Sequence, residues 1–143
     1  MMKEIKHQKQ GEMDCVCTCV AMIAGMKRKY IIAKYHDRYM NDPDFNVDNI
    51  LDDLNIKYRE CHKKEDVLSG RVYIVTVPSI NMPGYFHQII IDARINKSKP
   101  EIKIFDPNKG KKGRKYYVST VSGKARNQVK LLSYILDYEI LDF

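Results

Sequence analysis

The apolar pattern of the chain changes near residue 70, and this change constrains the fold more than any other feature. The first half carries apolar residues at helical spacing, whereas the second half has short runs of β-branched and aromatic residues separated by Pro, Gly, Asn or Asp. Helices followed by strands predict an α+β domain, with N-terminal helices packed on a C-terminal antiparallel β-sheet. At 143 residues, the chain is expected to form a single domain, residues 1–143.

Helix signals are clearest in three places before residue 55. The first helix is expected to start at an Asp14 cap and to run through Ala24 to a stop at Gly25. A second is predicted from Lys29 to Met40, before an Asn-Asp-Pro breaker. A third, capped by Asn46, has an apolar stripe made of Val47, Ile50, Leu51 and Leu54.

The second half of the chain predicts strands. The expected strands are Val72 to Val77, Tyr85 to Ala93, Ile102 to Phe105 and Lys115 to Thr120. The tail from Ala125 to Phe143 is ambiguous, with a helical reading for its first half and a strand for Tyr138 to Phe143.

The charge and the hydropathy of the sequence limit which partners and which cellular location we expect. The formal net charge of +7 and pI of about 9.2 suit acidic partners such as nucleic acid, acidic peptides or anionic lipid, although a general lysine bias explains the charge as well. No apolar run is long enough for a membrane span, and the polar N-terminus lacks the apolar core of a secretory signal. A cytoplasmic location is predicted, and delivery as a secreted effector by another protein's export system stays open.

Three cysteines lie at alternate positions in the stretch GEMDCVCTCVAMIAG, residues 11–25. Their C-x-C-x-C spacing does not match a zinc site, and a helix turns Cys17 away from Cys15 and Cys19, so neither a metal nor a cofactor is predicted. Cys17 and Cys19 are interpreted as core residues. Cys15 would occupy the first turn of a helix, where free N–H groups and the helix dipole stabilise a thiolate.

A nucleophilic thiol needs a base, and the chain offers four histidines. His7, His36 and His62 lie in polar segments and are expected on the surface. His87 begins a strong strand after a Pro-Gly turn, where it could serve as a base or be a buried structural residue. Asp106 follows the IKIF strand and would orient the His87 ring if the two strands pair.

These motifs resemble the papain-like cysteine peptidases, closest to the bacteriocin-processing domains that cut after double-glycine leaders. The resemblance rests on Asp14-Cys15 followed by VAMI, on Tyr85-Phe86-His87 before a strand, and on Phe105-Asp106-Pro107, and it covers roughly residues 8–108. It implies a papain-like fold in which Cys15 is the nucleophile, His87 the base and Asp106 the orienting residue. It also implies that Gln10 donates to the oxyanion hole.

The chain departs from the family pattern in several respects. The family has Gly after the nucleophile, where this chain has Val16. Gln10 lies five residues before Cys15, where the family usually has six, so Gln8 is the substitute candidate. The family's domains usually precede a membrane exporter, which this sequence does not contain.

Three functions follow as hypotheses. The leading one is a cysteine hydrolase that cleaves a peptide or isopeptide bond of a protein substrate. The alternative is a small papain-fold effector or toxin that acts on RNA and is neutralised by an immunity protein. It is motivated by the basic loop of Lys109, Lys111, Lys112, Arg114 and Lys115, with Tyr116 and Tyr117 as stacking partners for bases. A solvated hairpin tip explains that loop equally well, and a third hypothesis is a non-catalytic peptide binder.

Overall fold

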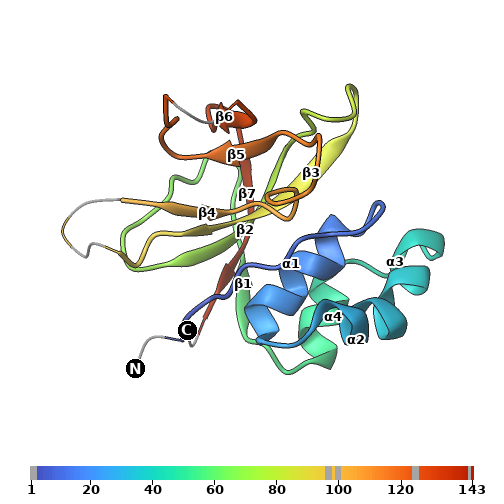
Figure 1. Ribbon diagram of the computed structural model, residues 1–143. Coiled ribbons are helices and arrows are strands. Elements are labelled where there is room, and N and C mark those ends of the chain that lie inside the picture. Colours follow the sequence, from blue (N-terminus) through green and yellow to red (C-terminus); the bar gives the residue numbers. More distant parts are fainter. Residues whose placement is uncertain (1–2, 96–97, 99–100, 124–125, 142) are drawn as a thin grey trace.

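The computed structural model describes residues 3–95, 98, 101–123, 126–141 and 143 (Figure 1). The helices gather on one side of the molecule and the strands on the other. The α+β class with a mostly antiparallel sheet is therefore confirmed. Within the described ranges, no helix combines the length and the apolar character that crossing a membrane requires.

The first helix has the predicted bounds. Helix α1 spans Cys15–Ala24. It closes at Gly25, whose φ of 67° is left-handed and whose N–H donates to the carbonyl of Met22. Asp14 begins the helix through its backbone, because its carbonyl accepts from the N–H of Thr18 at 2.9 Å. The expected side-chain cap is wrong: the Asp14 carboxylate binds other partners, which are described below.

The second predicted helix is continuous but changes its winding. It consists of α2 (Arg28–Ile31), a π-helical segment η1 (Ile32–His36) and α3 (Asp37–Asn41), so its ends lie one residue beyond the prediction on either side. Helix α4 (Val47–Asp53) follows the predicted Asn46, whose N–H donates to Asn49 Oδ1 at 2.8 Å. Its apolar stripe faces the core, except that Leu54 lies just past its end and is half-buried.

The main sheet has the strand order β1-β7-β2-β3-β4, and each pair in it is antiparallel. Its strands are β1 (Tyr58–Glu60), β2 (Val72–Pro78), β3 (Phe86–Asp92), β4 (Lys103–Phe105) and β7 (Ile135–Ile140). A second, two-stranded parallel sheet consists of β5 (Tyr116–Val118) and β6 (Gln128–Lys130). The four predicted strands between residues 72 and 120 are found, whereas β1 has no counterpart in the prediction.

The tail differs from the sequence interpretation. Residues 126–134 contain β6 and no helix, so the helical reading is wrong there, and its first residue, Ala125, lies outside the described residues. The last strand begins at Ile135, three residues before the predicted Tyr138, because it pairs with β2 along most of its length. The predicted strand residue Asp142 also lies outside the described residues.

Both faces of the main sheet are covered. Alternate residues of β2, such as Val72 and Ile74, pack with the helices in one apolar cluster. The intervening Tyr73, Val75 and Val77 pack in a second cluster with residues of β3 and of the β5-β6 pair. Burial on both faces explains why the β2 sequence is almost continuously apolar rather than alternating.

Candidate active site

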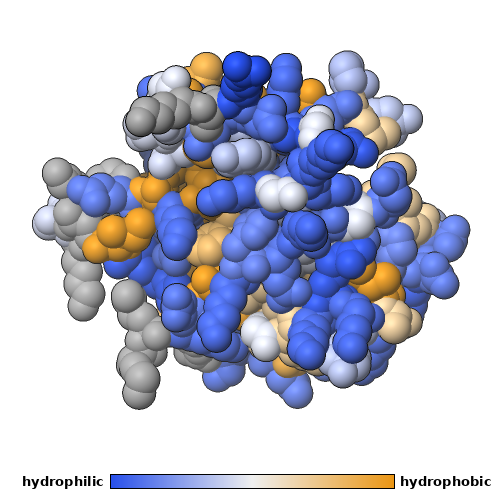
Figure 2. Space-filling view, in the orientation of Figure 1, coloured by the Kyte–Doolittle hydropathy of each residue, from blue (hydrophilic) through white to orange (hydrophobic). Residues whose placement is uncertain are grey.

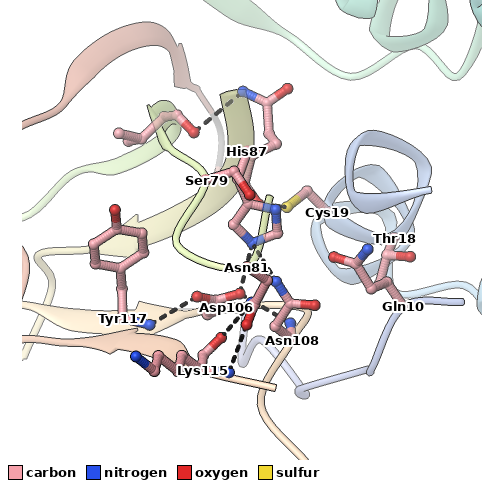
Figure 3. Close-up of polar contacts among 12 residues, drawn as sticks. Gln10, Thr18, Cys19, Ser79, Asn81, His87, Asp106, Asn108, Lys115 and Tyr117 are labelled. Carbon is pink, nitrogen blue, oxygen red and sulfur yellow. Dashed lines mark hydrogen bonds and ion pairs between the residues drawn. The ribbon is translucent and has the colours of Figure 1, made fainter. Parts of the chain in front are cut away.

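The pairing of β3 with β4 brings His87 and Asp106 together. Ile90 lies opposite Phe105 in this pair, so the start of β3 and the residue after β4 meet at the same end of the sheet. His87 Nε2 lies 2.7 Å from Asp106 Oδ1, and the two side chains are 6% and 1% exposed (Figure 3). The predicted strand pairing and the predicted contact between these two side chains are both present.

The Asp106 carboxylate is fixed from several directions. Besides His87, its Oδ1 accepts from the backbone N–H of Asn108 at 2.9 Å, and its Oδ2 accepts from the backbone N–H of Tyr117 at 2.8 Å (Figure 3). Charge-assisted hydrogen bonds of this kind compensate a buried carboxylate for lost hydration. They also leave Asp106 a single orientation, in which one oxygen faces the imidazole.

His87 is held in a state that favours its protonated form. Burial opposes the positive charge, but hydrogen bonds to Asp106 and to the Cys15 thiol outweigh it and raise the pKa of His87 from 6.5 to about 9. Since Nε2 is engaged by Asp106, Nδ1 is the ring nitrogen that remains for the thiol. The carboxylate and the imidazole are therefore hydrogen-bonded, and the imidazole and the Cys15 thiol line the same cleft.

Cys15 is the accessible cysteine of α1. It is the first residue of the helix, it is half-buried, and it lines a cleft of about 270 Å³ together with His87. Cys17 and Cys19 are both fully buried, as expected for core residues. Burial raises the pKa of the Cys17 thiol to about 12 and that of Cys19 well above its ordinary value. The Cys19 thiol donates to the carbonyl of Gln88 at 3.4 Å.

An ion pair between the buried Asp14 and the half-buried Arg28 shapes the loop that precedes Cys15. The Asp14 carboxylate accepts from Arg28 Nη2 at 2.6 Å and from the N–H of Gly11 at 2.7 Å. A Cβ on Gly11 would lie 2.2 Å from Arg28 Nη2 and 2.9 Å from Asp14 Oδ2, so a larger residue there would displace the ion pair. This ion pair was not predicted, because Asp14 precedes α1 and Arg28 begins α2, so the sequence around either residue carries no signal of the contact.

The structure separates the two oxyanion-hole candidates. Gln10 lines the cleft with Cys15, and its backbone N–H donates to the carbonyl of Pro107 at 2.8 Å. Its Nε2 donates to Gly11 at 3.3 Å, while its Oε1 is buried without a partner in the described part of the chain. Gln8 instead accepts from the N–H of Arg28 and donates to the carbonyl of Met26, so both ends of its amide are occupied away from the cleft.

Val16 belongs to both the core and the cleft. It is 9% exposed, packs in the cluster beneath the helices and lines the cleft next to Cys15. The branched side chain narrows the approach to the helix N-terminus, where glycine would leave the backbone open. The rest of the apolar lining comes from both sides of the cleft and includes Met13, Tyr39, Met40, Met82, Tyr85 and Phe86.

The basic loop lies beside this cleft, between β4 and β5. Lys109, Lys112 and Lys115 are exposed, Lys111 is half-buried and donates to the carbonyl of Gly11 at 3.0 Å, and Arg114 lines the cleft. The expected base-stacking role of Tyr117 is wrong. Its ring is 6% exposed and its hydroxyl donates to the carbonyl of Pro78 at 2.6 Å. Tyr116 is half-buried, and its hydroxyl accepts from Gln128.

The other histidines lie apart from the thiol. His62 is exposed, and His36 is half-buried rather than fully solvated. His7 is exposed as predicted, but its Nε2 donates to the backbone carbonyl of Asp106 at 2.9 Å, which ties the N-terminal segment to the site. In the described ranges, no group of three His, Cys, Asp or Glu side chains is arranged to hold a metal ion.

Comparison with known proteins finds no match to a family model, to a curated protein or to a solved structure.

Proposed function

We propose that the chain is a papain-like cysteine hydrolase that cleaves a peptide or isopeptide bond through Cys15, His87 and Asp106. The observation that carries the proposal is the His87–Asp106 hydrogen bond at the wall of the cleft that the Cys15 thiol also lines. An imidazole that is protonated at neutral pH can pair with a thiolate and then serve as the general acid. The buried Cys17 and Cys19 have no such access to a substrate.

The proposed reaction begins at the substrate carbonyl. The Cys15 thiolate attacks the carbonyl carbon, a C–S bond forms, and the negative charge moves to the oxygen. In this proposal the helix N-terminus at Cys15 and the side-chain amide of Gln10, which lines the same cleft, donate hydrogen bonds to that oxygen. Protonated His87 then transfers its Nδ1 proton to the leaving amine as the C–N bond breaks, which leaves a thioester on Cys15.

Water completes the cycle. Neutral His87 accepts a proton from the attacking water, and the hydroxide adds to the thioester carbonyl. The C–S bond then breaks, and the carboxylic acid product leaves the cleft while Cys15 returns to the thiolate. Asp106 keeps Nε2–H bonded through both steps, so the ring presents Nδ1 toward the sulfur each time.

The test is acylation by an activated ester. Wild type should release about one equivalent of the leaving group in a burst, and acid-quenched mass spectrometry should locate the acyl group on Cys15. Cys15→Ala should abolish the burst, and Cys61→Ala, a change at the other half-buried cysteine, should leave it intact. An equal burst in Cys15→Ala, or acylation spread evenly over Cys15 and Cys61, would contradict the proposal.

The RNA-directed effector remains the alternative, because the basic loop adjoins the cleft. Burial of the Tyr117 ring removes one of the two stacking surfaces on which that alternative depended. RNA cleavage by the purified protein that survives in Cys15→Ala would favour it. An immunity protein as partner stays a prediction.

A further inference from the structure

The loop between β4 and β5, residues 109–115, is built as part of the cleft rather than as a free hairpin tip. Its first end follows Asn108, which lines the cleft, and its other end is fastened by two hydrogen bonds between Asn81 and the backbone of Lys115, at 2.8 and 2.9 Å. Turn bonds inside it join the N–H of Lys111 to the carbonyl of Asn108 and the N–H of Arg114 to that of Lys111. The backbone of the loop is therefore held beside the cleft.

One anchor ties this loop directly to the catalytic segment. Lys111 Nζ donates to the carbonyl of Gly11, and Gly11 itself is bonded to Asp14, the residue before Cys15. Arg114 reaches the cleft lining that Cys15 and His87 share. The loop therefore borders the cleft that contains Cys15.

The charge of the loop is not neutralised by the protein. The stretch NKGKKGRKY, residues 108–116, contains five basic residues and no acid. In the described part of the chain, none of the five forms an ion pair; the acidic side chain in the cleft lining, Glu12, is exposed. Figure 2 shows hydrophilic side chains over much of one face of the molecule. An unpaired positive surface of this kind attracts an acidic ligand.

The opposite character prevails in the cleft itself. Phe86 is 75% exposed, Tyr85 59%, Met13 50% and Met40 47%, although each lies in the cleft lining. Large apolar side chains with this exposure favour an apolar group of a ligand. The site therefore combines an apolar cleft lining near the Cys15 thiol with the basic loop 109–115 at the border of the cleft.

We propose that the substrate is an extended polypeptide segment that sets a large apolar side chain in the cleft and carries acidic residues where it leaves over loop 109–115. This inference rests on the proposed function and adds the substrate class to it. A polypeptide fits better than RNA for two reasons. The ring of Tyr117 is buried and cannot stack on bases, and a thiol with an imidazolium partner is equipped for acyl transfer.

The first arm of the test measures binding without catalysis. Fluorescent peptides carry one large apolar residue, with Glu, Gln or Lys residues placed either before it or after it. Their affinity for Cys15→Ala is measured by fluorescence anisotropy. The Glu peptide should bind about tenfold more tightly than the Gln peptide at low salt, with the difference shrinking as the salt approaches about 300 mM. The side on which Glu helps identifies the direction of the bound chain.

Matched variants locate the effect. Lys109→Glu with Lys112→Glu should remove the preference for the Glu peptide, since both side chains are exposed at the loop. Lys63→Glu with Lys103→Glu makes the same change in net charge and should leave the preference intact. Lys63 is exposed after β1, and Lys103 is exposed opposite Asp92, at the end of β3 that lies away from His87. Equal affinity for Glu, Gln and Lys peptides would overturn the inference, as would tighter binding of a single-stranded RNA through the same lysines.

The second arm separates the two proposals. Cleavage of the same peptides by wild type should follow the order of binding in kcat/KM. Cleavage without any preference for Glu supports the proposed function and overturns the substrate class. Preference for Glu in binding with no cleavage of any peptide supports the docking surface and contradicts the hydrolase, leaving a peptide binder.

Discussion

Replacing Asp106 with Asn tests how the site controls its base. The change keeps the shape of the side chain but removes the charge that faces Nε2 of His87 at 2.7 Å. A buried hydrogen bond to a charged group contributes about 1.5 to 3 kcal/mol, and a pKa change of one corresponds to about 1.4 kcal/mol. We therefore expect Asp106→Asn to lower the pKa of His87 from about 9 by about 1 to 2, toward its ordinary 6.5.

A histidine NMR titration measures this change directly. The Cε1–H signal of His87, assigned by its absence in His87→Ala, should show a midpoint near pH 9 in wild type and a clearly lower one in Asp106→Asn. Asn108→Ala provides a comparison, because its amide lies 3.4 Å from the same nitrogen but carries no charge. Equal midpoints in wild type and Asp106→Asn would refute the reasoning that the carboxylate sets the charge of the ring.

The same shift has a consequence for folding. A pKa raised from 6.5 to about 9 on folding stabilises the native state by about 3 kcal/mol below pH 6.5. That contribution is lost as the pH rises through about 9, because the ring is then neutral in both states. Urea unfolding should therefore show the gap between wild type and Asp106→Asn widest near pH 6 and smaller near pH 10. A gap that widens as the pH rises would contradict the sign of this argument.

Three further substitutions test residues that surround the His87–Asp106 pair and Cys15. Gly11→Ala should slow acylation of Cys15 and destabilise the fold by about 1 to 3 kcal/mol in urea unfolding, because the added carbon meets the Asp14–Arg28 ion pair; an unchanged acylation rate would show that this loop does not position the site. Tyr117→Phe should cost about 1 kcal/mol of unfolding free energy in urea unfolding, because it removes the hydroxyl that donates to the Pro78 carbonyl; an unchanged free energy would show that this bond does not hold the β5 segment. Cys17→Ala should lower stability by about 1 kcal/mol and leave the acylation rate of Cys15 unchanged, whereas a slower rate would give Cys17 a share in the chemistry.

Sequence reasoning succeeded where the signal is local and periodic. The helix from Cys15 to Ala24 was predictable because a run of small and apolar residues follows Asp14 and ends at Gly25, and β2 because it is rich in β-branched residues. The contact of His87 with Asp106 followed from one assumption, that two neighbouring strands pair. The helix and β2 need no information from other parts of the chain, whereas the contact of His87 with Asp106 needed that one pairing.

The missed features depend on contacts between distant segments. The three-residue strand β1 forms only because β7 lies beside it, and β6 replaces the expected helix because it pairs with β5. The ion pair that holds the loop before Cys15 joins Asp14 and Arg28, which are 14 positions apart. Tyr117 looks exposed in a basic sequence, yet its ring is buried in the second apolar cluster and its backbone N–H fixes Asp106.

The most direct measurement is the rate at which each cysteine is alkylated by iodoacetamide between about pH 5 and pH 9, followed by peptide mass spectrometry in wild type and in His87→Ala. The account predicts that Cys15 reacts much faster than Cys61 near pH 6 and loses that advantage in His87→Ala, while Cys17 and Cys19 are protected by burial in both. Equal rates at Cys15 and Cys61, or a Cys15 rate that is unchanged without His87, would contradict it.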